Sequence, residues 1–201
     1  MPNQNRRLLA VIMDRSGSMA RVKHDAEGGL LTLLQEQKAN PAETLVSLYD
    51  FAREHSVVYE YAALDDVPLY ELRPSGSTAL LDAIGITISR INEQLDQMPE
   101  GEQPGEISLA IQTDGEENWS KRYNLAQVKA LITQQRAKGW KIVFLAADQD
   151  AITVAGRMGI DPDMALSYGS NKTEESLTRA GRMLSRGGGG FTDDDRNATS
   201  Y

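Results

Sequence analysis

Apolar and polar residues follow one another along the chain in blocks that predict alternating strands and helices. Apolar runs of strand length stand at residues 8–13, 107–111 and 140–147, a pattern typical of strands that are covered on both faces. Two more runs, at 44–51 and 57–61, are rich in β-branched and aromatic residues. The short polar link between these two predicts a strand followed by an antiparallel edge strand.

Apolar residues at helical spacing lie between these runs. They predict helices over about 21–37, from 80 to just before Met98, and from 125 to about 138. A short helix at 151–158, a short strand at 164–168 and a last helix at 174–186 complete the order. This alternation predicts an α/β fold with a doubly wound, mostly parallel sheet and helices on both faces.

The domain organisation follows from the same pattern. We expect an N-terminal extension at residues 1–6, one domain at 7–186 and a tail at 187–201. The four glycines at 187–190 do not readily continue the last helix, and the residues after them are mostly polar, with three aspartates in a row at 193–195. The sequence therefore predicts a flexible tail.

Composition narrows the classes of function. The chain has 201 residues and a net charge of −8, which argues against non-specific binding to nucleic acid because phosphate contacts need a basic face. It has no cysteine and only two histidines, so thiolate metal sites are excluded and a histidine-rich site is unsupported. We find no apolar stretch long enough for an export signal or a membrane span, and we expect a cytoplasmic protein.

Side chains with hard oxygen ligands stand at the ends of two predicted strands. Asp14, Ser16 and Ser18 follow the first apolar run, and Asp114 follows the run at 107–111. Thr78 opens a helix and could lie at the same sheet edge, where ligands of such sheets bind. Carboxylate and hydroxyl oxygens suit Mg²⁺, Mn²⁺ or Ca²⁺, so the sequence predicts a divalent metal site here.

These residues resemble the signature of von Willebrand factor type A domains that carry a metal-ion-dependent adhesion site. That signature is Asp-x-Ser-x-Ser, then a distant Thr and a distant Asp. The matching segments are Asp14-Arg15-Ser16-Gly17-Ser18, Gly76-Ser77-Thr78-Ala79-Leu80 and Thr113-Asp114-Gly115. The resemblance covers roughly residues 7–186 and is greater to stand-alone bacterial and phage members than to extracellular adhesion proteins.

The resemblance implies a Rossmann-like sheet with one antiparallel edge strand and a non-enzymatic role in protein binding. It implies Mg²⁺ or Mn²⁺, with Ca²⁺ as an alternative, held directly by Ser16, Ser18 and, in one state, Thr78. Asp14 and Asp114 would act partly through bound water, and a Glu or Asp of a partner protein would take the sixth position. In some members of that family the last helix shifts when the ligand binds.

Other interpretations remain open. Asp14 could serve only as a helix N-cap, and a Mg²⁺-dependent phosphohydrolase or phosphotransferase would also place an Asp after the first strand. Such chemistry needs a nucleophile or a positioned base, and Arg15 stands where a second carboxylate would be expected. A regulatory subunit of an ATPase-coupled complex is a special case of the binding module.

Overall fold

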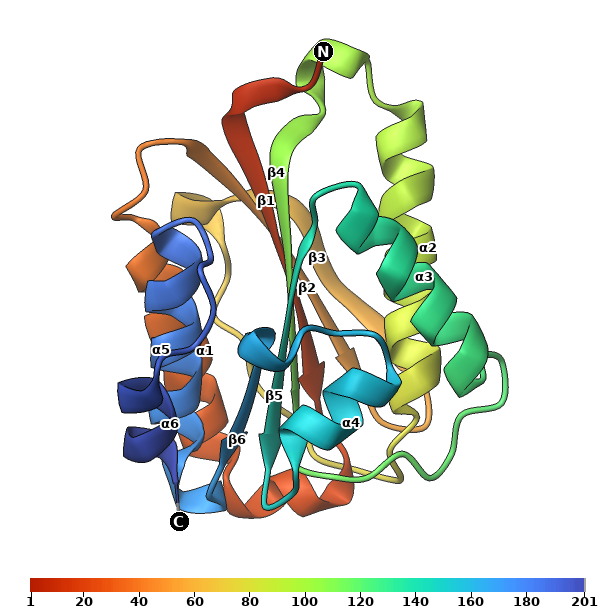
Figure 1. Ribbon diagram of the computed structural model, residues 1–201, viewed down its shortest axis with the longest axis vertical. Helices are drawn as coiled ribbons and strands as arrows, with labels where there is room; N and C mark the ends of the chain where they lie inside the picture. The colour runs from red at the N-terminus through yellow and green to blue at the C-terminus, as the bar shows by residue number, and fades with distance from the viewer. Residues whose placement is uncertain (201) are drawn as a thin grey trace.

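One six-stranded sheet lies between two layers of helices in the computed structural model, which describes residues 1–200 (Figure 1). The strands are β1 Asn3–Asp14, β2 Glu43–Phe51, β3 His55–Ala63, β4 Pro104–Thr113, β5 Lys141–Ala147 and β6 Ala165–Tyr168. Their spatial order is β3-β2-β1-β4-β5-β6. Only β3 runs antiparallel to its neighbour, which confirms the predicted mostly parallel sheet with one antiparallel edge strand.

The helices cover both faces of the sheet. They are α1 Lys23–Gln37, α2 Leu80–Gln97, α3 Leu125–Ala137, α4 Ala151–Arg157, α5 Thr173–Ser185 and α6 Asp193–Thr199. Figure 1 shows α1, α5 and α6 on one face and α2, α3 and α4 on the other. Within residues 1–200, no helix has the length and apolar character that crossing a membrane would require.

The position of β1 in the middle of the sheet explains why residues 8–13 form a continuous apolar run. Leu8, Ala10 and Ile12 pack into the core beneath α2, α3 and α4. Leu9, Val11 and Met13 pack into the core beneath α1 and α5. All six side chains are fully buried, so neither face of β1 can carry a polar residue without loss of stability.

Several strands extend beyond their apolar runs. β1 begins at Asn3, inside the segment predicted as an N-terminal extension, and Asn3 pairs with Pro104 of β4. Arg6 lies opposite Glu43 of β2, and the two side chains form an ion pair of 2.7 Å. Hydrogen bonding and cross-strand charge pairing extend these strands where hydrophobicity gives no signal.

The C-terminal segment differs from the predicted flexible tail. Residues 193–199 form helix α6, which begins with a capping box between Thr192 and Asp195. Phe191 is buried before it, Asp195 pairs with Arg179 of α5, and the Arg196 guanidinium donates to the Ala165 carbonyl. These tertiary contacts come from α5 and β6, so the local composition could not indicate them. Tyr201, the last residue of the predicted tail, lies outside the described residues.

Candidate metal centre

Asp14 and Asp114 lie at one edge of the sheet because β1 and β4 are adjacent and parallel. Met13 of β1 is in register with Gln112 of β4, so both strands end at the same level. Asp14 is the last residue of β1, and Asp114 comes directly after β4. The topology therefore brings together two aspartates that are far apart in the sequence.

A continuous set of hydrogen bonds joins four of the five predicted site residues. Asp14 Oδ1 accepts from the backbone N–H of Ser16 at 2.7 Å. The hydroxyls of Ser16 and Ser18 lie 3.1 Å apart, and Ser18 Oγ donates to Asp114 Oδ1 at 2.6 Å. The two serine hydroxyls thus bridge the interval between the two carboxylates.

Thr78, the fifth residue, is buried and adjoins this group through the loop after β4. A Cβ atom built on Gly115 would lie 2.9 Å from Thr78 Oγ1. Asn118 fixes the Thr78 backbone, since its side-chain oxygen accepts from the Thr78 N–H at 2.9 Å and its own N–H donates to the Thr78 carbonyl at 3.0 Å. The Gly17 N–H, donating to the Gly76 carbonyl at 3.0 Å, ties the first loop to the Thr78 loop.

Burial makes the two carboxylates costly to ionise. It raises the pKa of the Asp14 carboxyl to about 6, against the opposing hydrogen bonds from Thr113 and Ser16. Burial also raises the pKa of Asp114 above its usual range. Asp114 Oδ2 is buried and has no hydrogen-bond partner among residues 1–200, and the nearest cationic group, on Arg21, is 4.0 Å away.

This donor set fits a hard divalent cation. Two buried carboxylates and three hydroxyls lie close together here, and Asp114 Oδ2 has no hydrogen-bond partner among residues 1–200. The exposed Arg21 guanidinium, 4.0 Å from Asp114, is the only positive charge within that distance of either carboxylate in the described residues. A cation held between them would add positive charge and a partner for Asp114 Oδ2. In the described part of the chain no three His, Cys, Asp or Glu side chains group around one point, so carboxylates alone do not make up the candidate site.

Residues outside the five predicted ligands hold the site in shape. Thr113 Oγ1 donates to Asp14 Oδ2 at 2.5 Å and fixes that carboxylate from β4. Glu117 accepts from the N–H groups of Leu81, Trp119 and Ser120, and Asp82 accepts from those of residues 121–123. The position of Thr113, directly before the Asp of the third motif, was the one sequence feature that could have indicated its role. Helix α2 has Ala79 as its N-cap, without a side-chain hydrogen bond, so Thr78 does not cap the helix.

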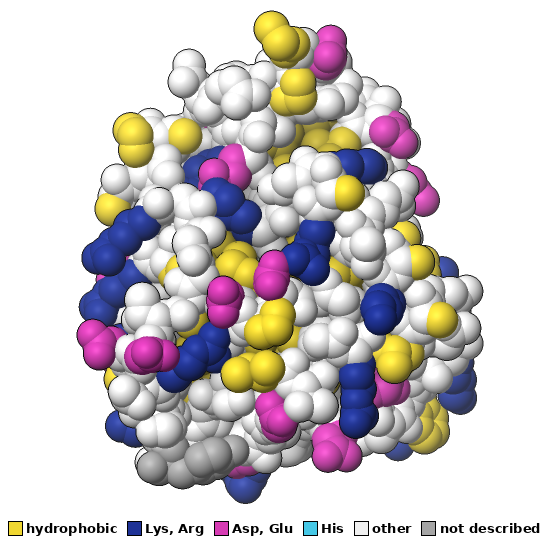
Figure 2. Space-filling model, viewed as in Figure 1, with side chains coloured by type: hydrophobic (Ala, Val, Ile, Leu, Met, Phe, Trp, Pro, Cys, Tyr) yellow, Lys and Arg dark blue, Asp and Glu magenta, His cyan; other side chains and the backbone are white. Residues whose placement is uncertain are grey.

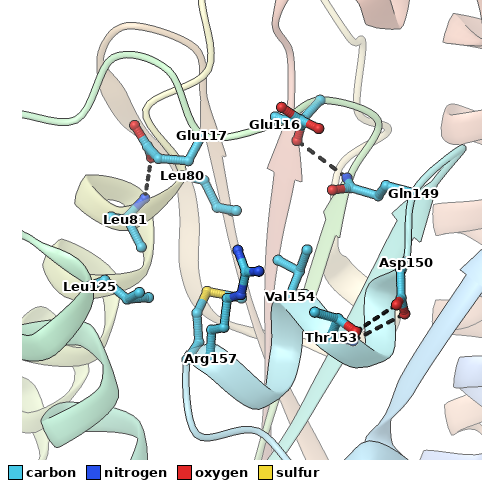
Figure 3. A pocket seen from close by; sticks show the side chains of 12 residues that line it. Leu80, Leu81, Glu116, Glu117, Leu125, Gln149, Asp150, Thr153, Val154 and Arg157 are labelled. Carbon is cyan, nitrogen blue, oxygen red and sulfur yellow. Dashed lines mark hydrogen bonds between the residues drawn. The ribbon is translucent and has the colours of Figure 1, made fainter.

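A pocket of about 420 Å³ opens beside Gly115, between the start of α2 and α4 (Figure 3). Apolar side chains of Leu80, Val154 and Met158 line it, and Figure 3 shows the Arg157 side chain reaching up between Leu80 and Val154. Gln149 at its rim donates to the Gly115 carbonyl at 3.3 Å. Through Gly115, the pocket adjoins the loop after β4 that carries Asp114 of the candidate metal site.

The sequence itself has no match among protein-family models or among curated proteins. Solved structures do match. Proximal thread matrix protein 1 from the mussel byssus superposes with a TM-score of 0.66 at 11% identity, over 91% of this chain and 49% of that one. The same mussel protein has also been solved with zinc in its metal-ion-dependent adhesion site, at a TM-score of 0.58 and 14% identity, over 91% of this chain and 46% of that one.

A third match is to a single domain of a larger protein. The von Willebrand factor domain of the type V pili tip protein Mfa5 from Porphyromonas gingivalis has a TM-score of 0.60 at 11% identity. The match covers 94% of this chain and 98% of that one, whereas the chain spans about half of the length of the mussel protein. Because the identities are low, these matches bear on the fold, and this chain has the fold of von Willebrand factor type A domains.

Proposed function

We propose that the protein is a metal-dependent protein-binding module. In this proposal Asp14, Ser16, Ser18, Thr78 and Asp114 hold a divalent cation, Mg²⁺ in the first instance and Mn²⁺ or Ca²⁺ as alternatives. A partner protein supplies a Glu or Asp carboxylate. The observation that carries the proposal is the buried Oδ2 of Asp114, which has no hydrogen-bond partner among residues 1–200 and lies at the end of the Ser16–Ser18 hydroxyl chain.

The balance of hydroxyls and carboxylates supports binding of an outside carboxylate. Three neutral hydroxyls supply ligands without cancelling the charge of the ion, so two carboxylates are the only full charges among the five residues. A cation held in this way attracts a further carboxylate as a Lewis acid. The zinc-occupied site reported for the mussel protein supports the choice of a divalent ion for this fold.

The surroundings favour binding over phosphoryl transfer. Arg15, the charged residue between the two ligand positions Asp14 and Ser16, is held away by Asp50 at 2.9 Å and by Ser75 at 3.1 Å. His55 forms a hydrogen bond with Thr87, and His24 lies beside Glu27. The two imidazoles are thus engaged elsewhere, and no acid–base pair of the kind that phosphoryl transfer needs is formed by them at the candidate site.

The test is a pull-down from the source cell combined with a direct titration of the metal. Mg²⁺ should raise the melting temperature of the purified protein, and a partner should be recovered in Mg²⁺ and lost in EDTA or with Asp14→Ala. Asp65→Ala is the matched control, since Asp65 is exposed and, among residues 1–200, pairs only with Lys38. Equal recovery of the partner with and without metal would overturn the mechanism.

A further inference from the structure

Two cationic side chains and an indole ring form a group at the metal-site edge. The Arg53 guanidinium carbon lies 4.6 Å from the centroid of the Trp119 ring, and Lys121 Nζ lies at the same distance. Contacts of this length are cation–π interactions, which hold flexible cationic chains in defined positions. We refer to Arg53, Trp119 and Lys121 as the cation–indole cluster.

The cluster adjoins the candidate metal site on the side of Thr78. Trp119 follows Asn118, whose two hydrogen bonds fix the Thr78 backbone. The Arg53 side chain packs against Gly76, with Cγ 3.4 Å from the position that a Cβ atom would take there. The Gly76 carbonyl accepts from the Gly17 N–H, so Arg53 packs against a loop that is tied to the Ser16–Ser18 loop. Trp119 belongs to the loop that begins with Asp114.

Among residues 1–200, no ion pair neutralises the positive charge of this cluster. Neither Arg53 nor Lys121 has a carboxylate within 4.0 Å among residues 1–200, and the same is true of Arg122, which shares a surface hollow with Arg53. The nearby carboxylates of Asp82 and Glu117 are occupied by backbone N–H groups.

One face of the molecule has a surface of mixed character. On the face shown in Figure 2, acidic and basic side chains are interspersed with apolar ones. The whole chain carries a net charge of −8, so the positively charged side chains of the cluster are opposite in sign to the overall charge. A local field of this sign attracts acidic partners and selects among them.

We infer that the partner segment that supplies the metal-binding carboxylate carries a second acidic side chain, which binds the cation–indole cluster. This inference rests on the proposed function, because the metal fixes the first carboxylate. Arg53 and Lys121 then donate charge-assisted hydrogen bonds to the second one. Trp119, 38% exposed, holds the two cations in place beforehand and so lowers the entropy lost on binding.

The probes are short glycine peptides with blocked ends. One peptide carries a single Glu, and a series of others carries two Glu separated by one to five Gly. The protein carries Trp140→Phe, so that Trp119 becomes the only tryptophan, and circular dichroism checks its fold. The fluorescence of Trp119 reports whether a peptide reaches the cluster. The affinity of each peptide is measured both in Mg²⁺ and in EDTA, and the difference between the two reports on the metal site.

At least one two-Glu peptide should bind about threefold to tenfold more tightly than the one-Glu peptide, and it should change the Trp119 emission. The gain should disappear in high salt and in the double variant Arg53→Gln, Lys121→Gln. The charge-matched control is Lys129→Gln, Lys138→Gln, because both lysines are exposed on or beside α3 and have no carboxylate within 4.0 Å in the described chain. This control should keep the gain.

The possible failures are distinguishable. Mg²⁺-dependent binding without any gain from the second Glu would overturn the inference and leave the proposed function standing. A gain and a Trp119 response that persist unchanged in EDTA would support the cluster and overturn the metal mechanism. If no two-Glu peptide changes Trp119 emission in either condition, the inference is wrong.

Discussion

Gly115 directly follows Asp114, and its missing side chain leaves room for the hydroxyl of Thr78. A Cβ atom at this position would lie 2.9 Å from Thr78 Oγ1, the end of a side chain that can rotate. We therefore expect Gly115→Ala to turn the Thr78 hydroxyl out of the site and to weaken Mg²⁺ binding by about tenfold, with less than about 1 kcal/mol of lost stability in EDTA.

Isothermal titration with Mg²⁺ and chemical unfolding measure the two effects of Gly115→Ala. Gly101→Ala is the control, because a Cβ atom there meets no atom within 4 Å. Unchanged Mg²⁺ affinity in Gly115→Ala would remove Thr78 from the set of ligands.

Asp14 is fully buried, and this burial raises the pKa of its carboxyl to about 6 from an ordinary value of 3.8. The metal-free folded state therefore binds a proton more tightly than the unfolded state does. The contribution of Asp14 to stability rises as the pH falls from about 6 toward 4, and it is least favourable at neutral pH. Asp14→Asn should accordingly raise the free energy of unfolding in EDTA at pH 7 by about 1–3 kcal/mol.

The comparison of wild type with Asp14→Asn isolates this group from other titrating residues. In EDTA the difference in unfolding free energy should shrink between pH 7 and pH 4.5. In excess Mg²⁺ at pH 7 the order should reverse, because the cation stabilises only the wild type, and its affinity should fall below pH 6 as protons compete for Asp14. A pH-independent difference in EDTA would contradict the assigned shift.

At the scale of single residues, the sequence predicted which candidate side chains come together better than it predicted the residues that support them. Asp14, Ser16 and Ser18 are close in the sequence and share a motif, so their convergence could be read from spacing. Thr113 donates to Asp14 from 99 residues away, and Asn118 holds Thr78 from 40 residues away. Such contacts depend on strand register and loop path, which no local pattern encodes.

The elements themselves followed the hydrophobic pattern closely, with the C-terminal segment as the exception. Helix α6 consists almost entirely of polar residues, and it is held by its cap and by pairing with α5. Asp195 accepts from the Thr192 N–H at 2.9 Å and from Arg179 at 2.8 Å. We expect Asp195→Asn to lower the free energy of unfolding by about 1–2 kcal/mol, since it weakens the cap and removes the ion pair.

Asp194→Asn is the matched control for Asp195→Asn. It lies one residue earlier in the same exposed turn of α6, removes the same charge, and has no ion pair in the described chain. Urea unfolding and amide exchange of residues 192–199 should separate the two variants. Equal stability of both variants would mean that the Asp195 contacts do not hold α6, which would then depend on the burial of Phe191 and Thr199 and on the hydrogen bond from Arg196 to Ala165.

Across the whole molecule, helix α5 is attached to the far end of the sheet and to α1. The buried Arg7 of β1 donates to the Leu184 carbonyl at 3.2 Å, and Gln37 of α1 donates to the Gly181 carbonyl at 3.0 Å. Asn40 donates to the Ser185 carbonyl at 3.0 Å. Gly181 also lets the helices approach closely, since a Cβ atom there would lie 2.9 Å from the Leu33 Cα.

These contacts bear on whether α5, the helix predicted at 174–186, shifts when a ligand binds. A slide of α5 by one turn would break the hydrogen bonds from Arg7 to the Leu184 carbonyl and from Gln37 to the Gly181 carbonyl, at about 0.5–1.5 kcal/mol for each. It would also break the Arg179–Asp195 pair that joins α5 to α6. We therefore expect α5 to keep its position when Mg²⁺ and a carboxylate ligand bind at the opposite edge of the sheet.

Hydrogen exchange read by mass spectrometry tests this expectation. Amides of residues 173–185 should exchange at the same rate in EDTA and in Mg²⁺, whereas those of residues 15–19 and 75–78 should become more protected as their loops order around the cation. Faster exchange in α5 on addition of Mg²⁺ would reveal a switch that Arg7, Gln37 and Asn40 fail to prevent. Because α3 lies on the other face of the sheet, its amides give the baseline for global changes in stability.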